Sequence, residues 1–417
     1  MIKHLLLTAF LGARLVSAQT SATAPAETRE EEIAKEQARK SESLKKPELE
    51  KGEVIFDKYF NSALRGLLAP KVGLGMRMGG LVTGSGFSAG VLYNRPDLWR
   101  EDLIFRASLT GSVKGYWAAA TELTLPHLAG EHVLASFFAR HSDAPRNPYY
   151  GSGPNSRKED WTTYRQEDTS FDGRLSWRPD RRHWDLGMYA GYLKVNVGPG
   201  THGERPSSEL VFTPSVAPGI LEQTDYLRYG PFAQVDFRDT PGNPHRGGNY
   251  VVRLLNFDDR NGRGYSFRRF SGWTEHYIPF FNEKRVIALR AMTDLTWTDR
   301  GNAVPFYMQS TLGDANDLRG YSLFRYRDNN TVLLSSEYRW EVAPGLDMAL
   351  FVDAGKVFRR PSELSLNNLR YTGGFGFRAK TRDAVVMRLD TGFSREGWVI
   401  WFKFDNAFSR EVFRYLF

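Results

Sequence analysis

The sequence predicts an all-β fold, a transmembrane antiparallel β-barrel of sixteen strands, and three observations carry this prediction. From about residue 71 onward, apolar and polar side chains alternate with a period of two, as in strands with one lipid-facing and one lumen-facing side. Most of the alternating segments exceed the roughly five or six residues of an ordinary globular strand and suit the roughly 9–11 residues that a membrane crossing needs. Short and long connections also alternate along the chain, which is typical of outer-membrane barrels. The expected strands are 71–79, 84–94, 101–112, 115–126, 131–142, 161–178, 183–197, 222–240, 248–259, 266–281, 285–299, 330–342, 346–357, 369–381, 384–394 and 397–408.

The alternation is clear in the segment 346–357, where Leu346 and Leu350 point to one face and Asp353 points to the other. A water-soluble β-sandwich would show the same alternation, because the pattern does not say which face is buried. Strand length and loop asymmetry favour the barrel, and an even number of strands closes an antiparallel barrel with both chain ends on one side. Residues 71–408 are therefore expected to form a barrel in a bacterial outer membrane.

The composition excludes several other classes of protein. The chain of 417 residues has no cysteine, which removes disulfides, thiolate metal sites, a cysteine nucleophile and a lipoprotein anchor. It has no uncharged apolar run of the roughly 18 residues that a membrane helix requires. The 56 basic and 48 acidic side chains give a mild net charge of +8, and no basic run with interleaved aromatics indicates nucleic-acid binding. Aromatic residues make up 14%, too many for a disordered chain.

The first 18 residues fit a signal peptide. Lys3 gives a basic start, 5–13 is mostly apolar, and Val16-Ser17-Ala18 satisfies the small-residue rule for cleavage. Residues 19–70 are expected to form an N-terminal periplasmic segment. Its charged stretch contains i,i+4 pairs but too few apolar residues for a core-facing stripe, so a flexible leader and a short helix docked on the barrel both stay open.

Few features of the sequence indicate catalysis or a cofactor. The eight histidines are scattered without metal-binding spacing, so we expect neither a metal nor another cofactor. The string Gly86-Phe87-Ser88-Ala89-Gly90 matches a nucleophile elbow, but it lies inside an alternating strand rather than at a strand-to-helix turn. A rim pair such as His141 with Asp143 is conceivable, although nothing in the spacing selects it. We therefore expect a protein that is not an enzyme.

The connection 300–329 is the longest, and a loop of this length is usually functional or disordered. Its aromatic residues favour an ordered loop. If it folds back into the barrel, Arg319 can reach the lumen-facing carboxylates of Glu337 and Asp353. A guanidinium suits this role because its fixed fork of donors can bridge two carboxylates.

Three motifs in this part of the chain resemble a known family. They are the LRGY tetrapeptide at 318–321, the SEYRW strand at 336–340 and the FVDAG strand at 351–355. In this order and spacing they resemble the bacterial surface antigen superfamily, whose members include the BamA and TamA assembly barrels and the two-partner-secretion transporters. A further segment resembles that family's mid-barrel hairpin through Asp236, Arg238, Asp239, Pro241, Pro244 and Gly247, and Phe408 resembles its closing aromatic strand-end signal. The resemblance covers about 71–408.

The resemblance implies a sixteen-stranded barrel with the long loop fixed inside the lumen. It implies that Arg319 contacts Glu337 and Asp353, and that the first and last strands meet at a weak seam that opens sideways. The residues expected to hold the loop are Leu318, Arg319, Gly320, Tyr321, Glu337, Phe351, Asp353 and Gly355.

Two features depart from the family pattern. Its transporters carry POTRA modules before the barrel, whereas residues 19–70 are too few and too weakly patterned for one, so the sequence suggests a form without POTRA domains. Residues 409–417 extend past Phe408, and Phe417 is an alternative end of the last strand.

Three functions follow as alternatives. The first is protein insertion or export through the lateral seam, with outer-membrane lipid and outer-membrane or exported client proteins as partners, no nucleic acid, and a homodimer left open. The second is a plugged or gated channel for small solutes, in which abundant inward arginine would favour anions. Its candidate charges are Arg228, Arg253, Arg290, Arg378 and Arg388. The third is a surface enzyme or adhesin that uses the extracellular loops. The sequence does not name a client or solute.

Overall fold

The computed structural model describes residues 72–79, 81, 84–98, 102–201, 205–281, 284–343, 345–381 and 384–404, together with Lys35. Contacts divide the chain into two units, 1–50 and 51–417. Several expectations fall outside the described residues: the signal peptide 1–18, most of the segment 19–70, the strand-end signal Phe408 and the extension 409–417. They stay predictions.

Sixteen strands of the described residues form one antiparallel sheet in which chain neighbours are also spatial neighbours. They are β1 (Gly73–Met78), β2 (Ser88–Leu98), β3 (Leu103–Ser112), β4 (Trp117–Leu128), β5 (Val133–Tyr149), β6 (Thr162–Trp177), β7 (Trp184–Pro199), β8 (Tyr226–Asp236), β9 (Gly247–Asp259), β10 (Phe267–Phe280), β11 (Arg285–Trp297), β14 (Asn330–Ala343), β15 (Leu346–Phe358), β16 (Arg370–Lys380), β17 (Val385–Ser394) and β18 (Gly397–Lys403). Every predicted strand has its counterpart in this list, so the all-β sixteen-stranded fold is confirmed.

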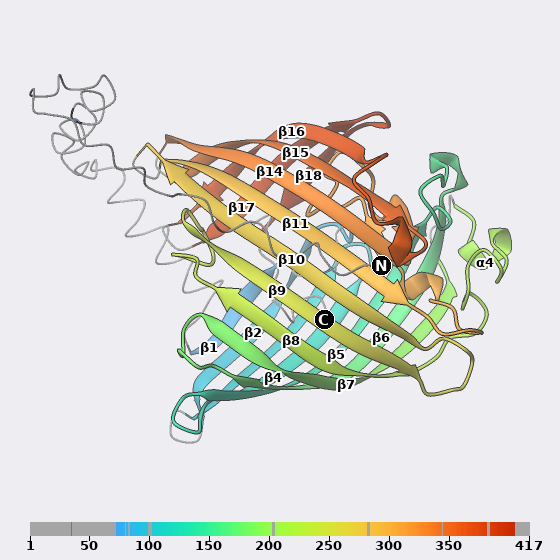
Figure 1. The fold of residues 1–417 in the computed structure, drawn as a ribbon, viewed down its shortest axis with the longest axis horizontal. Helices are drawn as coiled ribbons and strands as arrows, with labels where there is room; N and C mark the ends of the chain where they lie inside the picture. The colour runs from blue at the N-terminus through green and yellow to red at the C-terminus, as the bar shows by residue number, and fades with distance from the viewer. Residues whose placement is uncertain are drawn as a thin grey trace, which may run out of the picture. The chain divides into compact units, whose positions relative to one another are not determined.

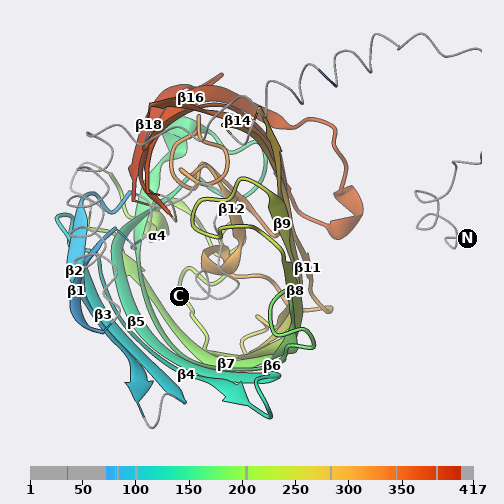
Figure 2. The ribbon, with the colours of Figure 1, turned by 90° about the vertical axis from the view of Figure 1, so that its left-hand side faces the viewer.

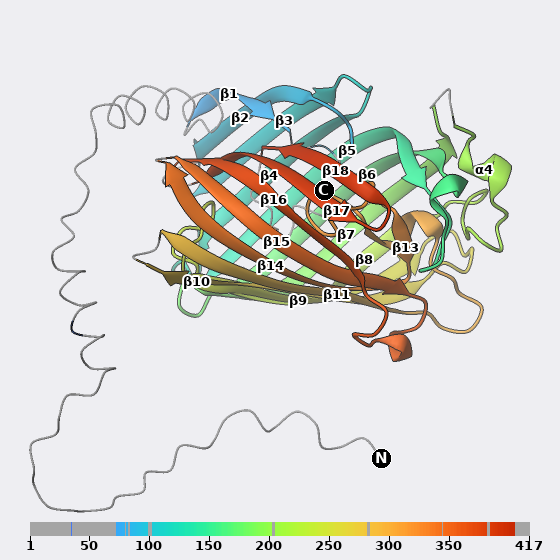
Figure 3. The ribbon, with the colours of Figure 1, turned by 90° about the horizontal axis from the view of Figure 1, so that it is seen from above.

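The sheet curls around a lumen, as the end view in Figure 2 shows. The strands are tilted, and the long connections with the short helix α4 (Ser208–Val211) lie at one end (Figures 1 and 3). The long-connection end is the extracellular one in outer-membrane barrels. The two edges of the sheet are β1 and β18, and within the described residues no ladder joins them.

The two faces of the wall differ as the alternation predicted. On β15, the side chains of Leu350 and Val352 are 51% and 55% exposed, whereas their neighbours Phe351 and Asp353 are buried. Since the exposed aliphatic and aromatic side chains recur around the barrel, the outer face suits lipid and the inner face holds the charge. No helix within the described residues is both long and apolar enough to span a bilayer.

Several boundaries differ from the prediction. β5 runs on to Tyr149, because its pairing with β6 continues as far as Tyr149 opposite Thr162, so the expected loop 143–160 is shorter. The segment between β11 and β14, called the lumen loop below (298–329), contains more structure than expected. It carries the 3₁₀ turn η3 (Phe306–Met308) and a two-stranded ladder of β12 (Ser310–Leu312) with β13 (Tyr326–Asp328). Two further 3₁₀ turns, η2 (Lys158–Asp160) and η4 (Pro361–Glu363), lie in other long connections.

The lumen loop lies inside the ring of strands (Figure 2). Aromatic side chains fix its first half: Phe306 is fully buried and contacts Tyr149 and Tyr164 of the wall at ring-centroid distances of 4.9 and 4.8 Å. Arg327 of β13 donates to the Phe306 carbonyl at 2.7 Å and lies over several of these rings. The loop therefore packs as part of the core.

Candidate functional site: the lumen loop and its ion-pair network

The loop tip (residues 313–321) folds into a compact turn deep in the barrel. The carboxylate of Asp317 accepts the backbone N–H of Gly313 at 2.8 Å and also that of Leu318. Tyr321 donates its backbone N–H to the Leu318 carbonyl at 3.0 Å. The side chains of Leu318 and Tyr321 are buried in an apolar cluster whose other members are Leu312, Tyr326, Leu333 and Val357. This packing presents Arg319 to the wall.

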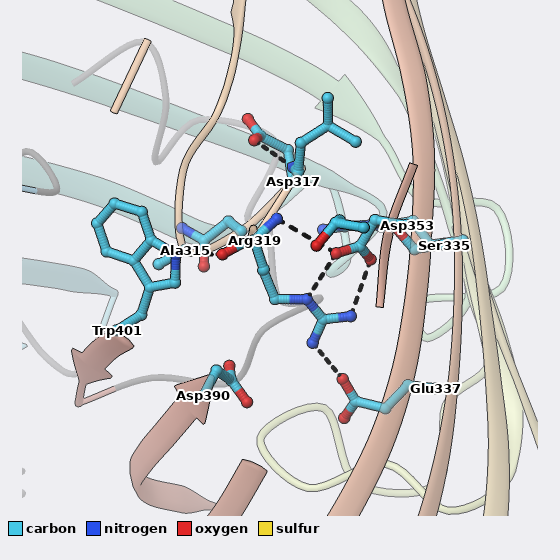
Figure 4. Close-up of polar contacts among 12 residues, drawn as sticks. Ala315, Asp317, Arg319, Ser335, Glu337, Asp353, Asp390 and Trp401 are labelled. Atoms are coloured by element: carbon cyan, nitrogen blue, oxygen red, sulfur yellow. Dashed lines mark hydrogen bonds and ion pairs between the residues drawn. The ribbon is translucent and has the colours of Figure 1, made fainter. Parts of the chain in front are cut away.

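Arg319 reaches carboxylates on two neighbouring strands (Figure 4). Its Nε and Nη2 donate to the two oxygens of Asp353 on β15 at 2.9 and 2.8 Å. Its Nη1 donates to Glu337 on β14 at 2.6 Å. All three side chains are fully buried. The structure thus places the three residues together, with the bidentate geometry that guanidinium and carboxylate favour.

The surroundings keep the Arg319 guanidinium charged. Its carbon atom lies 3.5 Å from the centre of the Phe351 ring, which forms a cation–π contact. Burial by itself would lower the pKa of Arg319, but the carboxylates of Asp353 and Glu337 outweigh it and raise the pKa above its ordinary value. Gly355 lies farther along the FVDAG strand, opposite Leu333.

The ion pairs extend beyond the three predicted residues. Glu337 also accepts Arg339 at 2.7 Å and Arg378 of β16 at 3.1 Å. Arg378 in turn pairs with Asp390 of β17 at 2.6 Å, and Asp390 pairs with Arg388 at 2.6 Å. We call these seven residues, Arg319, Glu337, Arg339, Asp353, Arg378, Arg388 and Asp390, the ion-pair network. It holds four positive and three negative groups.

Sequence reasoning missed part of this network. Arg378 and Arg388 were assigned to a hypothetical channel lining, whereas the structure pairs both with carboxylates, and it pairs Arg228 with Asp172 at 2.7 Å. The available signal was their inward position on adjacent strands, where Arg378 lies directly opposite Arg388. Without the strand register, that signal could not identify Asp390 as the group between them.

The loop tip also contacts the last two strands of the barrel. Trp401 of β18 donates its indole N–H to the Arg319 carbonyl at 2.7 Å, and Ser394 of β17 donates to the Gly320 carbonyl at 2.8 Å. A Cβ atom on Gly320 would meet the Thr372 hydroxyl and would lie 2.8 Å from the carbonyl carbon and oxygen of Phe393. Glycine is therefore required at position 320 for the loop to approach the wall.

The hairpin between β8 and β9 forms a second cluster at the opposite end from α4. Arg238 pairs with Asp236 at 2.6 Å and with Glu275 of β10 at 3.0 Å. Asp239 accepts the backbone N–H groups of Thr240, His245 and Arg246 and so closes the turn. Within the turn Pro241 is exposed and Pro244 is buried. Gly247 has a φ of +89°, in the left-handed region that glycine tolerates.

This hairpin contacts a part of the wall that is distant from it along the chain. The backbone N–H of Val385 donates to the Gly242 carbonyl at 3.0 Å, which joins the hairpin to the turn between β16 and β17. A further path leads to the loop tip: Tyr277 donates to Glu275 at 2.6 Å, and Arg339 lies 5.5 Å from the centre of the Tyr277 ring. The hairpin cluster and the ion-pair network are thus continuous through Tyr277.

The other candidate sites are not assembled in the described residues. Arg165 donates to both carboxylate oxygens of Asp143, and His141 contacts Thr169 at 2.8 Å. Ser88 begins strand β2, so the nucleophile-elbow string does not lead into a helix. Within the described part of the chain, no group of three or more potential metal ligands comes together.

These observations define a class of protein: an outer-membrane β-barrel whose lumen holds an ordered, ion-paired loop. A family model described as the Omp85 superfamily domain matches residues 105–393. The chain belongs to the Omp85 superfamily, which confirms the resemblance to the bacterial surface antigens and the location in the bacterial outer membrane.

Three solved structures show the same fold. BamA from Haemophilus ducreyi lacking POTRA domains 1–3 is 15% identical with a TM-score of 0.58, covering 78% of this chain and 67% of its own. CdiB from Escherichia coli is 12% identical with a TM-score of 0.53, covering 79% and 61%. CdiB from Acinetobacter baumannii is 12% identical with a TM-score of 0.50, covering 76% and 56%. This chain thus spans less than two thirds of either CdiB chain. No curated protein sequence matches it.

Proposed function

We propose that this protein inserts or translocates client proteins at the outer membrane through a lateral seam between β1 and β18, without chemical catalysis. Barrels of the Omp85 superfamily act as transporters and insertases, which supports the general class of function. The clients would be other outer-membrane barrels or exported chains.

The observation that carries this proposal is the state of the two sheet edges. β1 spans only Gly73–Met78 and β18 only Gly397–Lys403, and the described residues of these strands form no ladder with each other. An unpaired strand edge presents N–H and C=O groups that can pair with an incoming strand. A client strand would add to such an edge while its apolar side chains enter the lipid.

The loop tip supports the same proposal because it contacts one edge of the seam. Trp401 on β18 binds the Arg319 carbonyl, and Arg319 is fixed in turn by Asp353 and Glu337. The ion-pair network therefore holds β18 from the lumen side. We infer that it fixes the position of this edge while β1 moves away, and that the loop excludes solutes meanwhile.

A plugged channel is the second candidate, and one observation favours it. Two lumen cavities of about 210 and 220 Å³ adjoin each other and share Arg140 and Asp168 in their linings. Three of the arginines proposed to line such a channel are engaged in ion pairs, which weakens the original argument for charge rings.

The test is the folding rate of a second, unrelated outer-membrane barrel into liposomes. Liposomes that contain this protein should accelerate folding over empty liposomes. Arg319→Ala should abolish the acceleration, because the loop tip loses its ion pairs to Asp353 and Glu337 and no longer holds in place the backbone carbonyl that Trp401 of β18 binds. Arg360→Ala, which changes an exposed arginine beside η4, is the matched control and should retain full activity.

Heat-modifiable migration on gels would show that each variant is folded. If Arg319→Ala does not fold, Arg319→Lys keeps the charge but not the bidentate fork and replaces it in the assay. A folded wild-type protein that leaves the folding rate unchanged would contradict the proposal and favour the channel.

A further inference from the structure

A second cluster of arginines lies in the lumen, away from the ion-pair network. It surrounds the cavity of about 210 Å³ on the inner face of β5–β10, and the lumen loop contributes Met308 to its lining. Among the described residues, four arginines line the cavity, and Asp168 is the one acidic residue in its lining. The lining residues that matter here are Arg140, Asp168, Arg228, Arg253, Arg269 and Met308.

The charges around this cavity do not balance. Arg228 is neutralised by Asp172, which accepts its Nε and Nη2 at 2.7–3.0 Å. Asp294 of β11 lies near Arg253 and Arg269 and binds Ser310 at 3.0 Å. Counting Asp168, Asp172 and Asp294 against the four arginines leaves one positive charge. In a partly buried, low-dielectric cavity such an excess favours an anion.

Two of the arginines have donors available for a ligand. Arg269 donates Nε to the Thr296 hydroxyl at 3.0 Å and Nη2 to the Met308 carbonyl at 2.7 Å, and no carboxylate of the described residues lies within ion-pair distance of it. Arg140 has neither a hydrogen bond nor a close ion pair within the described part of the chain, and interacts with Asp168 only at longer range. Guanidinium groups with free N–H donors are suited to bidentate contact with tetrahedral or planar oxyanions.

We propose that this cavity binds a compact oxyanion of the phosphate class, held mainly by Arg140 and Arg269. The ligand comes from solution rather than from a lipid headgroup, because the cavity lies on the lumen face and Met308 of the loop closes one side of it. The hydroxyls of Ser170 and Ser271 in the lining add neutral donors. Binding of an anion in this cavity does not depend on any opening of the seam between β1 and β18.

The position of Met308 has a consequence for the loop. Arg269 contacts the ligand cavity and the Met308 carbonyl together, so the site is complete only while the loop is seated. A ligand that binds one conformation stabilises that conformation by mass action. Anion binding therefore favours the plugged barrel.

The test uses the full chain folded in a phosphate-free maltoside detergent and titrated calorimetrically with inorganic phosphate at constant ionic strength. Saturable binding at one site is expected, and Arg269→Gln or Arg140→Gln should each weaken it about ten-fold or more, since a hydrogen bond to a charged group contributes that much. Arg268→Gln is the matched control: Arg268 is the neighbour of Arg269 on β10, faces outward and, among the described residues, has the exposed Asp299 as its one ion-pair partner. Its affinity should equal that of the wild type.

A second readout is the temperature at which the folded band converts to the unfolded one. Phosphate should raise it for the wild type and for Arg268→Gln but not for Arg269→Gln. The proposal is overturned if the folded wild type shows no saturable binding. It is equally overturned if Arg268→Gln loses as much affinity as the two cavity variants, which would mean that phosphate binds the barrel only through its general charge.

Discussion

Glu337→Ala will strongly destabilise the barrel, lowering the free energy of unfolding by about 3–5 kcal/mol. Its carboxylate is fully buried and accepts Arg319, Arg339 and Arg378 together. Removing it takes one carboxylate partner away from three buried guanidinium groups. The formal charge of the ion-pair network rises from +1 to +2. Urea-induced unfolding in detergent measures the loss, and the loop tip should become sensitive to trypsin under native conditions.

Glu341→Gln provides the control on the same strand and the same face. Glu341 lies near the end of β14, is exposed, and shares Lys380 with Asp347. The Lys380 side chain is mostly buried, but it keeps Asp347 at 2.7 Å as a partner when Glu341 is neutralised. A partly exposed carboxylate of this kind contributes less than about 1 kcal/mol, so this variant should unfold close to the wild type. Equal losses in the two variants would show that Glu337 contributes no more than a surface pair.

Gly320→Val will expel the loop tip from the wall of the barrel. The added Cβ would meet the Thr372 hydroxyl and the backbone carbonyl of Phe393, and the backbone cannot move aside as a flexible side chain would. Overpacking of a rigid site costs about 1–3 kcal/mol. The bonds from Ser394 and Trp401 to the loop should be lost with it. Planar-bilayer recordings should show a larger conductance than in the wild type, because the lumen is no longer filled.

Gly111→Val controls for the change of glycine to valine. A Cβ on Gly111, in β3, meets nothing within 4 Å, and valine suits a strand. Its conductance should match that of the wild type. If Gly320→Val also conducts like the wild type and resists trypsin, the close approach at residue 320 does not hold the loop.

Much of the fold could be predicted because the wall obeys a simple rule. Alternation with a period of two sets each strand and its two faces, and on β15 it correctly assigned Asp353 to the lumen and Leu350 to the outside. The ends of the strands were harder to predict, because they depend on pairing with a neighbouring strand. β5 continues to Tyr149 since β6 offers it a partner, and alternation alone does not contain this information. The ladder of β12 with β13 was missed for the same reason.

The candidate site divides in a similar way. Arg319, Glu337 and Asp353 were identified from motif resemblance combined with their inward positions, and the structure places them within hydrogen-bond distance. Asp390 escaped notice because its role depends on the register between β16 and β17. The bond from Val385 to Gly242 was beyond sequence reasoning altogether, since it joins turns that are distant along the chain. What these residues do for a client protein stays a prediction.

The proposed lateral seam is tested most directly by closing it with a disulfide. A Cβ built on Gly79 lies 3.7 Å from the Cβ of Phe404, within the span of about 3.5–4.5 Å that a disulfide bridges. The natural chain has no cysteine, so Gly79→Cys with Phe404→Cys introduces a single pair at the residues that directly follow β1 and β18. Leu254→Cys with Phe270→Cys, opposite each other on β9 and β10, is the control pair in a part of the wall that need not open.

The measurement is the folding rate of the client barrel in liposomes, with each pair oxidised and then reduced. The reduced form controls for the replacement of Gly79, whose φ is +70°. We predict that oxidation of the seam pair abolishes the acceleration, that reduction restores it, and that the control pair is active in both states. Full acceleration by a seam pair whose disulfide has formed would contradict a function that depends on separating β1 from β18.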